Sequence, residues 1–304
     1  MAVYSYAEIF EKDLAQKYER EMVSNELALS NPGIKFLNAQ TIKIPRITVS
    51  GYKDHNRNTT GFNTGTITND WEPKKLTHDR DIEFVIDPMD IDETNLVLDV
   101  ANIQNTFETE QAIPEKDSYR FSKLYAEAKS YVAKGAVVDN EALTVANILE
   151  WFDEQMSKMD DLSVPQEGRM LYVTSAINKI MKSADGITRT MSVGVGDGSG
   201  GVVRRTVHQL DDVHIKTVPS SRFKTKYEFT SGCTPAAAAK QMNAMLIHPS
   251  CVISRDKYAY MKLFTPGTDS RTADNYIYQN RYYTDTFLIE RKSCGIAINA
   301  EAEG

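Results

Sequence analysis

The sequence lacks the runs and motifs that mark several large protein classes. No apolar run approaches the roughly 18 residues that a membrane-spanning helix needs. The chain contains no GK[ST] sequence, so a P-loop that cradles phosphates is absent, and it contains no GxSxG, HExxH or CxxC motif. Cysteine is scarce, since Cys233, Cys251 and Cys294 stand far apart. An odd and sparse set is typical of a reducing compartment and not of a disulfide framework.

An excess of positive charge is also absent. The chain of 304 residues has 35 Lys and Arg against 42 Asp and Glu, a net charge of −7. Proteins that bind nucleic acid irrespective of its sequence carry a basic face that replaces counterions, so this balance argues against that function. Met1 to Phe10 reads as helix and contains Glu8, which argues against a secretory signal. The length allows a sizeable core in one elaborate domain or two.

The strongest pattern in the chain runs from Asp92 to Gly135. Its apolar residues recur at helical spacing on both sides of a polar middle: Leu96, Val100, Ile103 and Phe107 before it, and Phe121, Leu124, Tyr125, Ala128, Tyr131 and Val132 after it. Gly135 follows Lys134 where such a helix is expected to end. Ile113-Pro114 interrupts the stretch, because proline removes a backbone donor and either kinks a helix or begins a new one.

Two interpretations of this stretch remain open. Taken as one kinked rod, about forty residues at about 1.5 Å each give a helix of about 60 Å. Taken separately, the halves are two helices of about twenty residues each in a helical domain. A rod of that length needs contact surfaces beyond its own domain, which indicates a subunit of a larger assembly.

A long polar excursion precedes the rod. Ile42 and Ile44, then Ile47 and Val49, alternate like a strand whose register shifts at Pro45. A second alternating run contains Ile82, Phe84 and Ile86. Between these runs, Gly51 to Asp79 is rich in Asn and Gly and poor in large apolar residues. Compact domains rarely contain so long a polar connection unless it is functional or disordered. The pattern favours an extended hairpin arm that contacts another protein, and a floppy surface loop is the alternative.

The other segments mix helices and strands without a regular βαβ rhythm, which predicts an α+β fold. Tyr4 to Leu29 is a plausible amphipathic helix, ended by Asn31-Pro32-Gly33. Further helices are expected after Thr144, from about Ser175, from Thr234-Pro235 and after Ser254. Short strands are expected at Met170–Val173, Val213–Val218, Met245–Ile247, Cys251–Ile253, Phe287–Ile289 and Ile296–Ile298.

Candidate chemical motifs do not withstand inspection. Gly196-x-Gly198-x-x-Gly201 matches a dinucleotide fingerprint, but the strand-like run 202–207 follows it where a helix is required. His208 and His214 flank Asp211 and Asp212 at a spacing typical of a surface turn, not of a metal site. The remaining acidic group is Asp87, Asp90, Asp92 and Glu93. The glycine at the sixth position and the glutamate at the twelfth position of a calcium-binding loop are missing. The acidic residues fit a helix N-terminus instead. We therefore predict no catalytic residue, no cofactor and no metal site.

Several stretches stand out in combination: Phe84–Asn95 (FVIDPMDIDETN), Ala101-Asn-Ile103, Ile113-Pro-Glu115, Asp117–Lys123 (DSYRFSK), Val218–Phe223 (VPSSRF), His248-Pro-Ser250 and Lys262–Gly267 (KLFTPG). In this order they resemble the major capsid protein of tailed bacteriophages, the Hong Kong 97-type fold. Each stretch is weak alone, but together they extend over nearly the whole chain.

The resemblance implies a division of the chain. Its parts are an N-terminal arm at 1–45, an extended β-hairpin loop at 46–86, a peripheral domain with a long spine helix at 87–134, an axial domain at 135–255, returning peripheral strands at 256–292 and a C-terminal strand near the axial domain at 293–304. Family members lay the extended loop over a neighbouring subunit. Some relatives begin with a fused scaffolding segment, whereas this chain opens on the arm, so a scaffold is expected as a separate protein.

The resemblance also implies function, partners and location. The chain is expected to assemble with copies of itself into the hexamers and pentamers of an icosahedral shell around double-stranded DNA. A scaffolding protein, a portal and head-completion proteins are the further partners expected, and DNA is touched only non-specifically. The protein would be assembled in the bacterial host cytoplasm and would reside in the virion. Some relatives cross-link a loop lysine, but beside Lys53, Lys74 and Lys75 no partner asparagine or catalytic acid is identifiable.

Two alternatives remain. One is a nanocompartment shell protein of the same fold. The other is a soluble enzyme in which the loop 194–201 acts as a lid.

Overall fold

The computed structural model describes residues 21–29, 41–55, 61–93, 100–184, 209–267 and 273–302. Several predictions lie outside these residues: the helix before Glu21, its stop at Asn31-Pro32-Gly33, the start of the rod at Leu96, the glycine pattern Gly196–Gly201 and its proposed lid, and His208. Within the described ranges, no helix is long and apolar enough to cross a bilayer.

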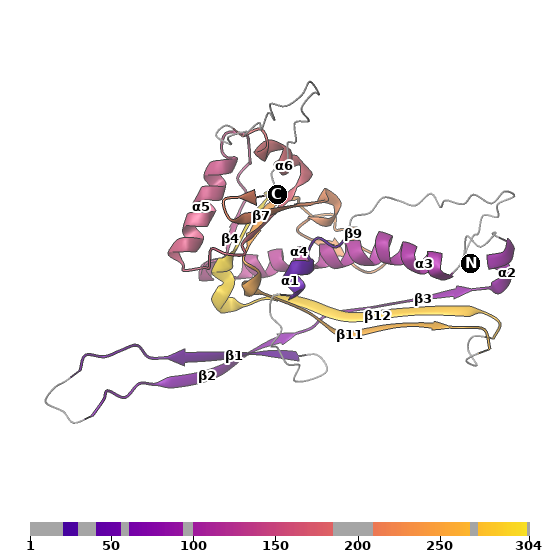
Figure 1. Ribbon diagram of the computed structural model, residues 1–304, viewed down its shortest axis with the longest axis horizontal. Coiled ribbons are helices and arrows are strands. Elements are labelled where there is room, and N and C mark those ends of the chain that lie inside the picture. The colour runs from indigo at the N-terminus through magenta and orange to yellow at the C-terminus, as the bar shows by residue number, and fades with distance from the viewer. Residues whose placement is uncertain are drawn as a thin grey trace, which may run out of the picture.

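A single helical rod runs along the molecule (Figure 1). It consists of α3 (Val100–Phe107), a π-helical turn η1 (Glu108–Ala112) and α4 (Ile113–Ser130), without a break. Pro114 lies in the first turn of α4, directly after the π turn. A π turn accommodates a proline because it opens the helical hydrogen-bond ladder at the point where proline cannot donate. The prediction of one interrupted rod is therefore confirmed, and that of two separate helices is wrong.

The rod ends as its sequence indicates. After the short 3₁₀ turn η2 (Val132–Lys134), Gly135 adopts a left-handed conformation with φ of 101°. A side chain added at Gly135 would lie 3.2 Å from Cβ of Cys294, so both the backbone angle and the space favour glycine.

A six-stranded mixed sheet forms the body of the molecule. Its strands, in spatial order, are β4 (Val137–Asp139), β13 (Ile296–Ala300), β10 (Met242–Ile247), β5 (Met170–Thr174), β7 (Val213–Val218) and β6 (Gln209–Leu210). The pairs β13–β4 and β5–β7 are parallel, and the other pairs are antiparallel. Together with the helical rod, this mostly antiparallel sheet confirms the predicted α+β class.

Both faces of this sheet are buried, which explains why its strands read as short apolar runs. Tyr172 packs with Phe121 and Leu124 of α4 on one face. Leu171 and Val173 pack on the other face, beneath α5 (Ile148–Asp161) and α6 (Ser175–Met181). The predicted helices near Thr144 and Ser175 are confirmed. The first begins only at Ile148, after a turn in which the amide of Thr144 donates to Oδ1 of Asn147 at 2.6 Å.

A second, three-stranded antiparallel sheet runs beneath the rod (Figure 1). It contains β11 (Val252–Phe264), β12 (Tyr276–Leu288) and β3 (His78–Ile86), in that order. Phe84 of β3 contacts the ring of Phe107 on the rod at a centroid distance of 5.5 Å and stacks on Tyr278 of β12. The short helix α2 (Pro88–Glu93) follows β3 at the far end of this sheet.

The hairpin of β1 (Thr41–Val49) and β2 (Ile67–Lys75) projects from the body away from that end (Figure 1). This confirms that the segment forms a hairpin arm, but the predicted pair of strands is wrong. The second strand is β2, from within the polar excursion, whereas the run with Ile82 and Ile86 lies in β3 and pairs with β12. The predicted register shift at Pro45 is wrong, because pairing continues unbroken from Thr41 opposite Lys75 to Val49 opposite Ile67. Both strands of a two-stranded ribbon are edge strands, where proline is tolerated.

Two predicted helices are strands or turns. The segment after Ser254 belongs to β11, whose 13 residues pair along β12 with a bulge between Asp256 and Tyr258. Thr234–Pro235 is the strand β9, paired with β8 (Tyr227–Glu228). The backbone after it is held in turns, with the amide of Ala236 donating to the carbonyl of Lys226. In both places, tertiary pairing overrides local helical preference. The remaining short elements are α1 (Asn25–Leu29), η3 (Ser220–Arg222), η4 (Pro249–Cys251) and η5 (Glu290–Gly295).

A buried carboxylate on the rod fastens two other segments to it. Asp117 of α4 is fully buried, and it accepts hydrogen bonds from the amide and hydroxyl of Ser24, the latter at 2.6 Å. The guanidinium of Arg222, 2 % exposed, donates to the other carboxylate oxygen of Asp117 at 3.1 Å. Arg120 donates to the hydroxyl of Ser24 from the next turn of the helix. One carboxylate therefore joins the N-terminal segment, the rod and η3.

Replacing Asp117 by alanine should lower the free energy of unfolding by about 3–5 kcal/mol, because the buried groups of Ser24 and Arg222 would lose the carboxylate to which they donate. Urea unfolding of dispersed subunits measures the loss. Asp153, exposed on α5, provides the control, and its replacement by alanine should change stability by no more than about 0.5 kcal/mol. Equal losses for the two variants would contradict the role of Asp117.

Candidate assembly surfaces

The hairpin presents an apolar face that nothing in the described chain covers. Alternate residues of a strand share a face, and so do residues paired across an antiparallel ladder. Pro45, Ile47 and Val49 therefore share one face with Ile67 and Trp71. Their large side chains are open to solvent: Ile47 is 63 %, Val49 65 % and Ile67 76 % exposed. Because the register does not shift at Pro45, this apolar set lies opposite the face that carries Ile42 and Ile44.

The base of the hairpin is built into the body. Ile42 and Leu76 are buried with Ile253 of β11 and Phe287 of β12 in a small apolar cluster. The hydroxyl of Tyr283 donates to the carbonyl of Leu76 at 3.0 Å. The hairpin is therefore held firmly at one end, while the apolar face of its outer part is open to solvent.

Charged groups fasten the next part of the hairpin. Nζ of Lys74 donates to the hydroxyl of Tyr131 at 2.5 Å and lies 3.2 Å from Glu72 and 3.8 Å from Glu127. Burial would lower the pKa of Lys74, but the hydrogen bond from Lys74 to Tyr131 and the charge of Glu127 outweigh it, so the pKa is raised. Arg291 donates to the carbonyl of Ile47 at 3.0 Å. Among the loop lysines, Lys74 is thus engaged, whereas Lys53 and Lys75 are exposed.

A second bare apolar region lies at the opposite end of the molecule. Val85 of β3 is 50 % exposed and Met89 of α2 is 63 % exposed. Met261 and Leu263 of β11 are also exposed. Exposed apolar side chains are ordinary when scattered, but gathered at two projecting ends they mark contact surfaces.

The rod is joined to the three-stranded sheet through Glu115. Its carboxylate accepts from Nε of Arg80 at 2.7 Å and from the hydroxyl of Tyr282 at 2.8 Å, and it lies 3.6 Å from Nε2 of His78. Burial alone would raise the pKa of Glu115, but the nearby His78 ring and the hydrogen bonds from Arg80 and Tyr282 outweigh it and lower the pKa to about 2. The His78 ring stacks on Tyr119 at 3.7 Å. The carboxylate is ionised and fully engaged, so it serves as a structural junction.

The residues considered above for metal binding or covalent chemistry have structural roles in the fold. The side chain of Asp87 accepts from the amide of Met89 at 2.9 Å, just before α2. The prediction that the acidic group lies at a helix N-terminus is therefore confirmed for Asp87 and Asp90 and wrong for Asp92 and Glu93, which end α2. In the part of the chain that the structure describes, no three His, Cys, Asp or Glu side chains are grouped to hold a metal ion. Burial raises the pKa of Cys233 to about 11 and that of Cys251 to about 12, so both thiols stay protonated and are poor nucleophiles.

No protein-family model and no curated protein matches the sequence. Solved structures match nearly the full length. A chain from "Capsid structure of the Cyanophage P-SCSP1u" has a TM-score of 0.66 at 12% identity, over 98% of this chain and 93% of that chain. One from "Asymmetric unit of bacteriophage PhiM1 mature capsid" gives 0.65 at 12%, over 99% and 93%. One from "Mycobacterium phage Che8" gives 0.63 at 12%, over 96% of each. The chain therefore shares the fold of these phage proteins.

Replacing Glu115 by glutamine should reduce stability in a pH-dependent manner. The pKa of this carboxyl is about 2 in the folded protein against an ordinary value of 4.5. A carboxyl group whose pKa is lower in the folded protein than in the unfolded chain stabilises the fold at pH values above its unfolded pKa. This stabilisation is lost as the pH falls through the folded pKa. The difference in unfolding free energy between the wild type and Glu115→Gln should therefore be constant above about pH 5 and shrink towards about pH 2.

Urea unfolding at a series of pH values measures this difference, with Glu154→Gln on the exposed face of α5 as control. A gap for Glu115→Gln that stays the same down to pH 2 would contradict the assignment.

Proposed function

We propose that this protein is the major capsid protein of a tailed bacteriophage, of the Hong Kong 97-type fold. It self-assembles into the hexamers and pentamers of an icosahedral shell that encloses double-stranded DNA. The observation that carries the proposal is the match to phage capsid structures over nearly the whole length of both chains, which includes a projecting hairpin and a long rod. A protein that ends in two bare apolar regions is incomplete as a monomer.

Multiple weak contacts supply the mechanism. Burial of one large apolar side chain contributes about 1.5–3 kcal/mol, and Ile47, Val49, Ile67 and Trp71 offer four on each hairpin. A single hairpin contact of this size is reversible. Closed symmetry repeats it around every ring, and joining several contacts per subunit raises the total affinity without any new chemistry.

The regions take roles that follow from this assignment. Residues 1–45 form the arm, 46–86 the extended loop, 87–134 the peripheral spine, 135–255 the axial domain, 256–292 the returning strands and 293–304 the final strand. The six-stranded body then supplies the contacts around each capsomer axis. The hairpin lies over a neighbouring subunit.

The proposed function has no chemical step. The chain has no enzymatic role, and its partners are its own copies, a separate scaffolding protein, a portal and head-completion proteins. The net charge of −7 suits a shell that must not bind the packaged DNA tightly. Assembly takes place in the host cytoplasm and the product is the virion.

Electron microscopy and the particle mass of the expressed protein, with and without a scaffolding partner, test the proposal. Closed shells, rings or capsomers are expected. A protein that is strictly monomeric under every condition would overturn it. Co-purification of an enzyme cargo inside the shells would favour the nanocompartment alternative.

Placing a charge on the apolar face of the hairpin should abolish assembly without unfolding the subunit. Ile67→Asp puts a carboxylate on that face, whereas Thr68→Asp puts the same group on the opposite face one residue away. We expect Ile67→Asp to lower the yield of shells by about tenfold or more, since burying an unpaired charge costs well over the 1.4 kcal/mol that tenfold requires. Shell yield is read from sedimentation.

Thr68→Asp should assemble like the wild type, and circular dichroism should show both variants folded. Equal effects of the two substitutions would contradict the role of the apolar face. A further variant replaces Ile47–Asn69 by an Asn-Gly turn between Arg46 and Asp70, which are directly opposite in the ladder. It keeps the buried base with Leu76 and should stay a folded, unassembled subunit.

A further inference from the structure

The three-stranded sheet ends in two edge strands. Its order is β11–β12–β3, so among the described strands β11 and β3 each pair with β12 alone. The unpaired N–H and C=O groups of an edge strand can bind a further strand from another chain. Near Arg80 the segment 229–232 approaches β3, because the guanidinium donates to the carbonyls of Phe229 and Gly232. The stretch of β3 beyond this contact is residues 81–86.

The two edges carry opposite charge. Residues 81–86 of β3 contain two carboxylates and no base, whereas residues 257–264 of β11 contain two amines and no carboxylate. Arg281 of β12 lies between the two strands and binds Asp79 at 2.7 Å, outside the stretch 81–86. Two β3 edges therefore repel each other, and so do two β11 edges, whereas a β11 edge and a β3 edge attract each other.

Contacts within one copy position two of these charged groups without neutralising them. Nζ of Lys262 lies over the ring of Phe264, 4.4 Å from its centroid. The carboxylate of Glu83 accepts a hydrogen bond from the amide of Gln279. A phenyl ring and an amide are neutral, so Lys262 and Glu83 keep their charges for a further partner.

A cavity of about 570 Å³ borders the same edge of β3. Ile82 and Phe84 line it on the side that faces the rod, together with Phe107 and Ala112 of the rod itself. Asp81 also lines it, although successive residues of a strand point to opposite faces, so the cavity extends to the edge of the strand. A strand bound at this edge can therefore place apolar side chains against the cavity.

The β11 strand has exposed apolar side chains on the corresponding face. Met261 is 58 % exposed and Leu263 is 44 % exposed. Both point towards the rod, since Leu263 lies opposite Tyr278, which in turn lies opposite Phe84. Nε2 of Gln104 on the rod also donates to Sδ of Met261 at 3.4 Å.

The residues match when the sheet of one copy continues at the same level into the next copy. Across one copy, the ladder joins Lys262 through Gln279 to Glu83. A second copy placed alongside then brings its Lys262 next to Glu83 and its Leu263 next to Phe84. Both β11 and β3 run antiparallel to β12, so the pairing between copies placed in this way is parallel.

Other registers match poorly. A slip of one residue turns Leu263 away from the cavity, because it moves every side chain to the other face. A slip of two residues brings Phe264 next to the carboxylate of Glu83 in one direction, and Lys262 next to Val85 in the other.

We propose that β11 of one copy binds along the edge of β3 of a second copy, with Met261 and Leu263 against the cavity beside β3. Within one copy β12 separates the two strands, so only another copy can supply β11. The contact is heterologous, because two different edges meet, and heterologous contacts propagate into rings or lattices. This inference rests on the proposed self-assembly and assigns to it a specific pair of strand edges.

The strands of the hairpin are less suited to these edges. Pro45 lies within β1 and Pro73 lies within β2, whereas β11 and β3 contain no proline. Proline cannot donate to a strand ladder, so each hairpin strand would leave a gap in the pairing.

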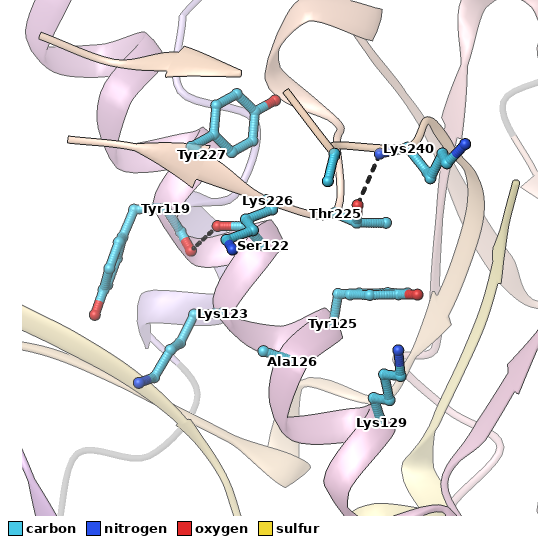
Figure 2. A pocket seen from close by; sticks show the side chains of 11 residues that line it. Tyr119, Ser122, Lys123, Tyr125, Ala126, Lys129, Thr225, Lys226, Tyr227 and Lys240 are labelled. Carbon is cyan, nitrogen blue, oxygen red and sulfur yellow. Dashed lines mark hydrogen bonds between the residues drawn. The ribbon is translucent and has the colours of Figure 1, made fainter. Parts of the chain in front are cut away.

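A second groove lies between α4 and the segment 225–240 (Figure 2). Tyr227 of β8 lines it, but β8 is only two residues long. A ladder of several residues cannot form there, so the cavity beside β3 is the better site for an added strand.

Engineered disulfides test the pairing in the full-length protein. Glu83→Cys combined with Lys262→Cys should link neighbouring copies when assembled particles are treated with a mild oxidant, because adjacent strands lie about 5 Å apart. Within one copy the same two positions are separated by β12 and lie about 10 Å apart, which is too far for a disulfide. Gels run without reductant should therefore show dimers and larger covalent multimers.

The control pair is Asp79→Cys with Lys262→Cys. Asp79 lies on the same face as Glu83 but four residues, about 13 Å, along the strand, so this pair should give no more multimers than the wild type. Assembled particles in which the Glu83 and Lys262 positions do not link would overturn the inference. Linking of Glu83→Cys to Ile47→Cys instead would also overturn it, in favour of the hairpin as the added strand.

A second measurement uses assembly itself. Leu263→Asp should lower shell yield by about tenfold or more, since it places a carboxylate against an apolar cavity. Val145→Asp, at a body residue that is 40 % exposed, is the matched control and should assemble like the wild type, with both variants folded by circular dichroism. Equal yields for the two variants would overturn the inference. If the wild type does not assemble at all, the proposed function itself fails.

Discussion

A two-stranded ribbon cannot bury both of its faces, and the rest of this structure depends on that constraint. An isolated hairpin is at best marginally stable in water. Here the inner end is stabilised by Ile42 and Leu76 in the body, and by the ion network around Lys74. The outer end keeps its apolar face in solvent. A surface that is costly to expose and firmly positioned is suited to a second copy of the chain.

The rod and the two sheets make that positioning possible. Asp117 joins the rod to the N-terminal segment and to Arg222, and Glu115 joins it to the three-stranded sheet. Both carboxylates are buried and accept hydrogen bonds from charged or hydroxyl donors, so removing either carboxylate takes a buried acceptor from those donors. The body, the rod and the projecting ends therefore form one rigid unit. A stiff subunit loses little conformational freedom on assembly, which favours association through modest contacts.

Periodicity was sufficient to predict the features built from local pattern. The rod, its stop at Gly135, the buried strands and the hairpin all follow from spacing and turn residues. The failures occur where strand pairing overrides a local helical signal. The segment after Ser254 pairs with β12, in which Thr286 lies opposite Ser254. Thr234–Pro235 pairs with the nearby Tyr227–Glu228, so a short local hairpin stands where a helix was expected. At Pro45, the assumed shift placed all the isoleucines on one face, whereas the regular ladder divides them between two.

Contacts between residues far apart in the chain could not be predicted from local sequence patterns either. Asp117 and Arg222 both stand in stretches that carry the capsid resemblance, but only the fold shows that one holds the other.

Amide hydrogen exchange at the hairpin tests the central claim most directly. The amides of the outer ladder, from Arg46 to Val49 and from Ile67 to Asp70, should exchange rapidly in dispersed subunits and markedly more slowly in assembled particles. The amides of β10 in the body should exchange equally slowly in both states. If the outer hairpin were equally protected before and after assembly, its apolar face would already be covered within one molecule, and the account would be wrong.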